Sequence, residues 1–185
     1  MIRGAGVGLR HVAHADLPLL ERALADRDVF GEFNPSRMTA PRDIRKRFEE
    51  TGYSSEDFEM LLVLDDRDAV VGHVLHFAAR RYSSARELGW MIHDIERRRR
   101  GLASAAVGLL VDYLFRSLPV HRLECCASPL NGASVRVAEK NGFVREGVLR
   151  GLVFAGGQHI DSVVMSQLRP EWEARRTALG GAALG

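Results

Sequence analysis

The sequence has few cysteines and no long apolar stretch, and each of these shortages excludes a class of protein. Its only two cysteines, Cys125 and Cys126, are adjacent on an expected strand, so their side chains point to opposite faces. This arrangement predicts neither a structural disulfide nor a zinc site, and a reducing cytoplasm is the simplest compartment. No apolar run approaches the length of a membrane span, and we expect no signal peptide, no membrane partner and no metal.

An excess of charge of one sign is also missing. The 26 basic and 24 acidic residues leave a formal net charge of +2, which is too small to predict a DNA-binding protein. The 185 residues predict one domain with a sizeable core, over residues 1–169. The remaining segment, 170–185, is polar and then rich in glycine and alanine, so we expect a short helical turn and a disordered end.

The spacing of apolar residues predicts an α/β fold with a mixed sheet of about seven strands. Strands are expected over Val7–His11, Phe58–Leu64, Val70–Ala79, Arg86–Ile92, Arg122–Ala127, Phe143–Ala155 and His159–Leu168. Helices are expected over Asp16–Ala25, Pro41–Glu50, Ala103–Arg116 and Asn131–Asn141, with a loop over Val29–Ala40.

The most informative segment is a run of four arginines, Arg97–Arg100, that enters a small-residue turn and then a helix. A turn that opens a helix exposes unpaired backbone N–H groups at the positive end of the helix dipole. Gly101 and Ala103 keep this turn bare, so that a phosphate oxygen can approach the backbone. The segment therefore predicts a pyrophosphate site. A solvated basic face and a nucleic-acid patch are the alternatives.

Two motifs in the expected order resemble the GNAT superfamily of N-acetyltransferases. The first is Arg98-x-x-Gly101-x-Ala103, between a strand and a helix, which is similar to the acetyl-CoA loop of that family. The second resembles the RimJ/RimL-type branch, which acetylates ribosomal-protein N-termini, and consists of Asn131, Ser134, Glu139, Lys140, Gly142, Phe143, Glu146 and Gly147. The resemblance covers roughly residues 7–168.

The resemblance implies a twisted, mostly antiparallel mixed sheet with flanking helices, splayed between its fourth and fifth strands. Acetyl-CoA would lie in that cleft, with its pantetheine arm paired to the backbone near Met91 and Ile92. Asn131 would bond the pantetheine, and Ser134 would lie near the thiol. The pyrophosphate would rest on Arg98, Arg99, Arg100, Gly101, Leu102, Ala103 and Ser104.

Acetyl transfer to an amine needs a base, and Glu87 is the candidate. By alternation it shares a face of its strand with Met91, and the family resemblance supports the role. A structural salt bridge is the alternative role for Glu87, and Glu124 is the next candidate base. Ser134 is the candidate group at the thiol, although a contact with the helix backbone would also explain a serine there. The oxyanion donor is expected to be a backbone N–H near Met91 or Ile92.

The resemblance favours a protein or peptide N-terminal α-amine as the acceptor, with a small-molecule amine, such as an antibiotic or a biosynthetic intermediate, as the alternative. Two other classes of function stay open on the sequence. A non-catalytic acyl-CoA-binding module could do without Glu87, and an arginine-rich RNA or ribosome binder would not need Ser134 or Asn131. A homodimer is plausible for this family, but no feature of the sequence requires one.

Overall fold

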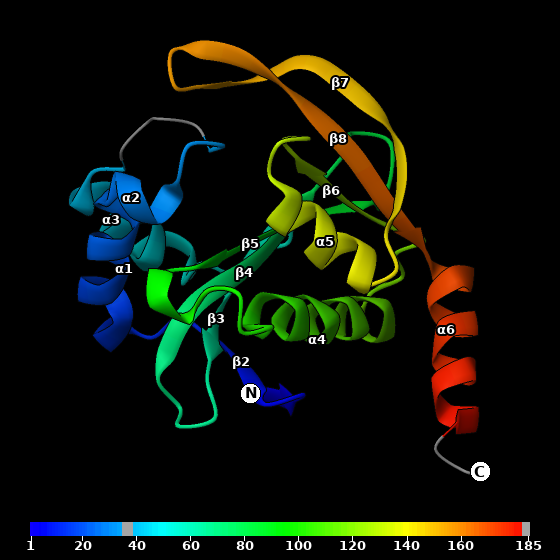
Figure 1. Ribbon diagram of the computed structural model, residues 1–185. Helices are drawn as coiled ribbons and strands as arrows, with labels where there is room; N and C mark the ends of the chain where they lie inside the picture. Colours follow the sequence, from blue (N-terminus) through cyan, green and yellow to red (C-terminus); the bar gives the residue numbers. More distant parts are fainter. Residues whose placement is uncertain (35–38, 183–185) are drawn as a thin grey trace.

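The computed structural model describes residues 1–34 and 39–182, and it contains one eight-stranded sheet with helices on both faces (Figure 1). The strands are β1 (Ile2–Gly4), β2 (Val7–His11), β3 (Phe58–Leu64), β4 (Val70–Ala78), β5 (Arg86–Ile92), β6 (Arg122–Ala127), β7 (Val144–Ala155) and β8 (Gln158–Leu168). Their order in the sheet is β1-β2-β3-β4-β5-β6-β8-β7, and only β5 and β6 are parallel neighbours. The expected fold class is confirmed, with eight strands because Ile2–Gly4 pairs with β2.

The helices agree with the expected ones to within about two residues where the sequence predicted them. They are η1 (His14–Asp16), α1 (Leu17–Ala25), α2 (Arg27–Phe30), α3 (Pro41–Thr51), η2 (Ile95–Arg97), α4 (Leu102–Ser117), α5 (Gly132–Lys140) and α6 (Arg169–Ala182). The short helix α2 was not expected, since it overlaps the loop predicted over Val29–Ala40. Residues 35–38 of that predicted loop lie outside the described residues. Within the described ranges, no helix has the length and apolar character of a membrane span.

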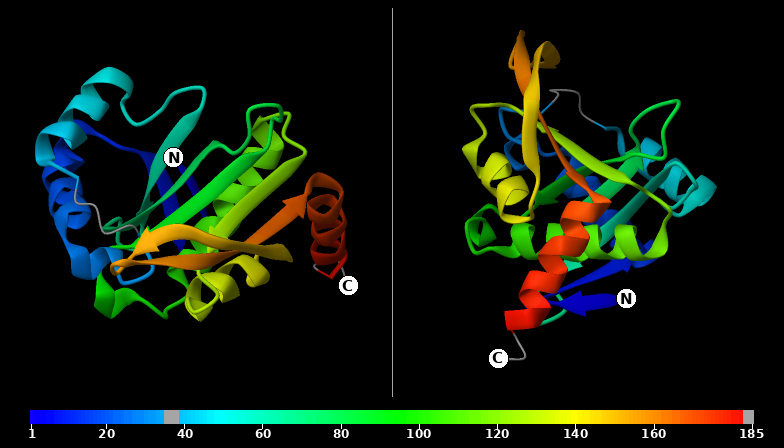
Figure 2. Two further views of the ribbon diagram at one scale, coloured as in Figure 1. Left: turned by 90° about the horizontal axis from the view of Figure 1, so that it is seen from above. Right: turned by 90° about the vertical axis from the view of Figure 1, so that its right-hand side faces the viewer.

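Two clusters of apolar side chains lie on the two faces of the sheet. The alternation along β3 shows this, because Leu61 packs into the cluster beneath α4 and α5 while Leu62 packs into the cluster beneath α1 and α3. Helix α4 buries Leu110 and Leu114 completely, as its apolar stripe predicts. The β7–β8 hairpin stands out from this body (Figure 2) and arches toward the α1–α2 side (Figure 1).

The expected splay lies between β5 and β6. These two strands are in register only at Arg86↔Leu123 and Glu87↔Glu124, and beyond Glu87 they separate. The backbone of β5 alternates between its two edges, and the N–H of His93 donates to the Val71 carbonyl of β4 at 2.9 Å. The backbone groups of Met91 therefore face β4, while those of Trp90 and Ile92 face the open edge.

The expectation of a short turn and a disordered end after residue 169 is wrong for residues 170–182, which belong to α6. The reason is Trp172, whose ring is buried against Phe115 at a centroid distance of 5.2 Å and whose indole N–H donates to Asp112 at 2.6 Å. Arg169 adds three hydrogen bonds to carbonyl groups at the end of α4 and in the segment that follows it. One buried aromatic and one arginine thus fix a segment whose composition predicts disorder. Residues 183–185 lie outside the described residues.

Candidate active site

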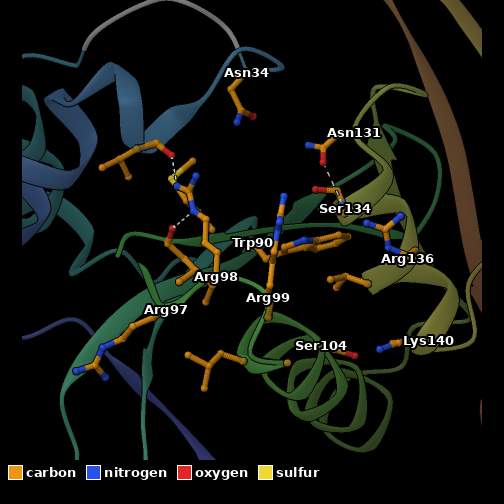
Figure 3. Close-up of a pocket in the computed structure, with 18 of the residues that line it drawn as sticks. Asn34, Trp90, Arg97, Arg98, Arg99, Ser104, Asn131, Ser134, Arg136 and Lys140 are labelled. Atoms are coloured by element: carbon orange, nitrogen blue, oxygen red, sulfur yellow. Dashed lines mark hydrogen bonds between the residues drawn. The ribbon is translucent and has the colours of Figure 1, made fainter. Parts of the chain in front are cut away.

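A cavity of about 630 Å³ opens where β5 and β6 diverge (Figure 3). Its walls are the end of β5, the arginine turn with the start of α4, the start of α5, and α2 with the residues after it. All of the predicted cofactor-binding residues except Arg100 line it, namely Met91, Ile92, Arg98, Arg99, Gly101, Leu102, Ala103, Ser104, Asn131 and Ser134. Arg100 is exposed and lies outside the lining. The two motifs, which are about thirty residues apart in the sequence, therefore line the same cavity.

The turn before α4 has the conformation that an anion site requires. Gly101 is the N-cap of α4 with φ of 82°, and a Cβ there would meet no atom within 4 Å. The first amide to bond back along the helix is that of Ala105, which donates to the Gly101 carbonyl at 3.0 Å. The N–H groups of Leu102, Ala103 and Ser104 therefore have no partner within the helix. The glycine leaves the space in front of them open.

The arginines of the run have different roles. Arg97 lines the cavity, but its guanidinium group pairs with Asp65 and with Asp94. Arg98 donates from Nε to the Ile92 carbonyl at 3.0 Å and from Nη2 to the Val29 carbonyl at 2.6 Å, so it ties the end of β5 to α2. Arg99 stands in the lining between Arg98 and α5 (Figure 3). Because two of the four guanidinium groups are held within the protein, the run is a weaker RNA-binding patch than its sequence predicts.

Helix α5 forms the opposite wall. The Asn131 side chain caps this helix, because its Oδ1 accepts the Ser134 N–H at 3.1 Å. Arg136 and Lys140 also line the cavity from α5, one helical turn apart (Figure 3). The sequence analysis did not assign these two cations to the cofactor site. Their spacing of four residues places them on one face of the helix that follows Asn131, and this pattern could have indicated them. It also missed Val29, Phe30, Asn34 and Trp90.

Glu87 lies on β5 four residues before Met91, and it is not part of the cavity lining. Burial, and then the facing Glu124 carboxylate, raise the pKa of Glu87 above its usual range. A hydrogen bond with Cys126 and the charge of Arg80 act in the opposite direction. In the described part of the chain Glu87 makes no ion pair, whereas Glu124 pairs with Arg122 at 2.8 Å and with Arg80 at 3.3 Å. Of the two candidate bases, Glu124 is thus the one held in salt bridges.

Comparison with known protein families agrees with this geometry. Residues 7–144 match the model of the acetyltransferase (GNAT) domain, which is well over half of the chain. The chain belongs to the GNAT family. Within this family it is 30% identical over 154 residues to the probable N-acetyltransferase YjcK of Bacillus subtilis, a match that covers 80% of this chain and 85% of the relative.

Solved structures of GNAT enzymes share the fold. Spermidine N-acetyltransferase from Vibrio cholerae, in complex with CoA and spermine, superposes with a TM-score of 0.82 at 19% identity, covering 91% of this chain and 99% of that one. RimJ of Mycobacterium smegmatis, in complex with CoA-disulfide, gives a TM-score of 0.80 at 22% identity and covers 94% and 89%. This GNAT chain is an acyltransferase that uses acetyl-CoA as cosubstrate. No group of metal-ligating side chains occurs among its described residues.

Proposed function

We propose that this GNAT enzyme acetylates a protein or peptide N-terminal α-amine by direct attack in a ternary complex, and that it belongs to the RimJ/RimL-type branch. The observation that carries the proposal is the continuity of the cavity, from the turn at Gly101 to the open edge of β5. One end offers cations and backbone N–H groups, and the other approaches the strand that carries Glu87. An elongated ligand with phosphates at one end and a reactive group at the other fits this order.

The phosphates of acetyl-CoA would bind at the turn and along α5. The amides of Leu102, Ala103 and Ser104 point their N–H groups out of the first turn of α4, which suits the pyrophosphate. Arg99 and the two α5 cations, Arg136 and Lys140, supply positive charge for the remaining phosphate oxygens. Arg98 supports the site indirectly, because its two hydrogen bonds hold the wall that the ligand contacts.

The pantetheine arm would pair with the open edge of β5. Trp90 presents its backbone groups there and Ile92 presents its N–H, since the Ile92 carbonyl accepts from Arg98. The Ile92 N–H is therefore the candidate donor to the thioester oxygen as that oxygen gains charge. Met91 lines the cavity, but its backbone groups face β4. We therefore expect no backbone pairing between Met91 and the pantetheine arm. Asn131 would bond the arm through its amide nitrogen, because its oxygen caps α5.

Glu87 would accept the proton of the attacking amine. The neutral amine nitrogen then forms the bond to the acetyl carbon and the carbon–sulfur bond breaks. The second proton, which the nitrogen loses as the amide forms, goes to the leaving thiolate. Ser134 lies at the start of α5, where its hydroxyl can donate a hydrogen bond to the sulfur. The raised pKa of Glu87 suits this role, because a base with a pKa nearer to neutrality takes a proton from an amine more readily.

A polyamine is the second candidate acceptor, because the spermidine enzyme shares the fold of this chain. The carboxylate that faces Glu87, that of Glu124, is already paired with Arg122 and Arg80 and so is not free to bind a second ammonium group. This balance favours an acceptor with a single amine. A homodimer stays a prediction of the family resemblance.

Calorimetric titration tests the cavity, and thiol release tests the acceptor. We expect acetyl-CoA and desulfo-CoA to bind tightly and ATP to bind weakly. With acetyl-CoA saturating, a peptide with a free N-terminus should release CoA thiol, and the same peptide with a blocked N-terminus should not. Faster release with spermidine than with any free-N-terminus peptide would overturn the α-amine proposal. Equal binding of ATP and acetyl-CoA would overturn the assignment of the cavity.

A further inference from the structure

A row of polar side chains crosses four adjacent strands on the face of the sheet that carries Glu87. Glu87 of β5 is in register with Glu124 of β6, and Glu124 is in register with Ser166 of β8. Ser166 Oγ donates to Glu146 of β7 at 2.6 Å, and Glu146 accepts from Arg122 Nη1 at 2.7 Å. Arg122 in turn donates from Nε to Glu124 at 2.8 Å. These hydrogen bonds connect Ser166, Glu146, Arg122 and Glu124, and Glu124 is the member that faces the candidate base, Glu87.

We propose that Glu124, held by Arg122 and Arg80, is a positioning residue that sets the proton affinity of the Glu87 base. The proposal rests on the function proposed above, in which Glu87 accepts the amine proton. It assigns the two carboxylates different roles. Glu124 is a fixed anion that never contacts the substrate, and Glu87 is the group that takes up the proton.

The fixed position of Glu124 follows from its contacts. Its side chain is 3% exposed, and both of its partners are guanidinium groups, one of which is itself held by Glu146. Such a carboxylate cannot turn away from its neighbour on the next strand. Two facing carboxylates disfavour being ionised together, so the proton goes to the one without a salt bridge, which is Glu87.

The other groups around Glu87 do not cancel this effect. On β6, the Cys126 thiol shares a hydrogen bond with Glu87, and burial raises the pKa of that thiol to about 11, so it acts as a neutral partner. Cys125 lies on the opposite face of β6, and its thiol pKa is raised to about 12. In the connection between β4 and β5, the charge of Arg80 acts on Glu87 and lowers its pKa, but Arg80 pairs with Glu124. The pKa of Glu87 remains raised in the presence of all of these groups.

This arrangement matters for the chemistry because an ordinary carboxylate is a weak base toward an ammonium group. A neighbouring anion makes the carboxylate of Glu87 a stronger proton acceptor and brings its titration closer to the working pH. Proton transfer to Glu87 also leaves one negative charge in the pair instead of two. The proton later leaves Glu87 for solvent, so the pair returns to its starting state.

The test is Glu124→Gln, which keeps the shape of the side chain and removes its charge. Asp68→Asn is the matched control. It removes one carboxylate that is paired with an arginine, Arg3, in the β3–β4 turn, where an asparagine tolerates the φ of 62°. Two quantities are measured in each protein. One is the acid limb of kcat/KM against pH, and the other is the titration midpoint of the Glu87 carboxyl carbon by NMR, assigned with Glu87→Gln.

We expect Glu124→Gln to lower both midpoints by roughly one pH unit and to reduce the plateau of kcat by about three- to tenfold. Asp68→Asn should move neither midpoint by more than about 0.2 units, since exposed distant charges are screened. An unchanged NMR midpoint in Glu124→Gln would overturn the proposal, whatever the enzyme acetylates. A shifted NMR midpoint with an unshifted acid limb would overturn the catalytic role of Glu124 and leave acetyl transfer itself intact. A merely structural role for Glu124 predicts a lower rate with both midpoints unmoved, which would also overturn the proposal.

Discussion

Substitution of Gly101 provides the sharpest test of the anion site, because two variants of equal size separate charge from backbone strain. Gly101→Glu and Gly101→Gln both place a side chain in open space at a φ of 82°. Both therefore cost about 1–2 kcal/mol for the left-handed conformation. Only the glutamate places a negative charge in front of the first turn of α4, where the phosphates would bind.

The size of the charge effect follows from Coulomb's law. Two unit charges about 4 Å apart interact with about 4 kcal/mol at an effective dielectric constant of 20. Gly101 is exposed, and the glutamate can turn toward solvent, so we expect about half of that value. A difference of about 2 kcal/mol corresponds to roughly 30-fold in Kd for acetyl-CoA between the two variants.

The assay is calorimetric titration with acetyl-CoA at about 0.05 M and about 0.5 M salt, after thermal melts have shown that both variants are folded. The difference between the glutamate and glutamine variants should shrink at the higher salt concentration, because the Debye length falls. Equal Kd values for the two folded variants would refute the assignment of phosphates to this turn. A difference that does not change with salt would refute its electrostatic origin.

Three further predictions follow from particular contacts. Glu87→Gln should lower kcat by about 10²- to 10⁴-fold while the calorimetric Kd for acetyl-CoA stays within about threefold, and a kcat close to that of the unmodified enzyme would exclude Glu87 as the base. Trp172→Ala should lower the free energy of unfolding by about 3–5 kcal/mol and Trp172→Phe, which keeps a buried aromatic ring but loses the bond to Asp112, by about 1 kcal/mol; equal losses in urea titrations would contradict the buried position of the ring. Burial lowers the pKa of His73 to about 3 and that of His93 to about 4, so these histidines take up protons at a higher pH in the unfolded chain than in the folded one. The free energy of unfolding should therefore decrease as the pH falls below 6.5, by up to about 1.4 kcal/mol per pH unit for each histidine. His73→Gln should flatten this slope between pH 6.5 and 4, and an unchanged slope would show that His73 does not contribute to it.

The sequence predicts most of the fold because local patterns and tertiary packing agree. The buried apolar residues of α4 pack against the sheet, and β6 begins and ends at the residues predicted for it. The tail shows where composition fails. The buried ring of Trp172 and the hydrogen bonds of Arg169 anchor a helix that is rich in residues typical of disordered ends, and no periodic pattern in the sequence predicts these contacts.

Within the cavity, the backbone turn could be predicted but the partners of the charged side chains could not. A glycine directly before a helix leaves the first backbone N–H groups accessible to an anion, so the role of Gly101 could be predicted from the sequence. Arg98 and Arg99 are adjacent, chemically identical and both in the cavity lining, yet Arg98 is held by two carbonyl groups whereas Arg99 is exposed. Which of Glu87 and Glu124 is salt-bridged depends on Arg122 of β6 and on Arg80 between β4 and β5, and the register of β5 and β6 places the two carboxylates opposite each other.

The open edge of β5 has a consequence for compounds that would block this enzyme. Trp90 presents its backbone groups and Ile92 presents its N–H two residues along, a repeat of about 6.6 Å along a strand; the Ile92 carbonyl already accepts from Arg98. A competitor that satisfies them must behave as a surrogate strand, with amide groups at that spacing on a narrow, extended scaffold. A flat polycyclic ring would leave these polar groups desolvated and unpaired, which costs affinity. Inhibitor design for this protein therefore starts from linear diamides, with an anionic group at the end that faces Gly101.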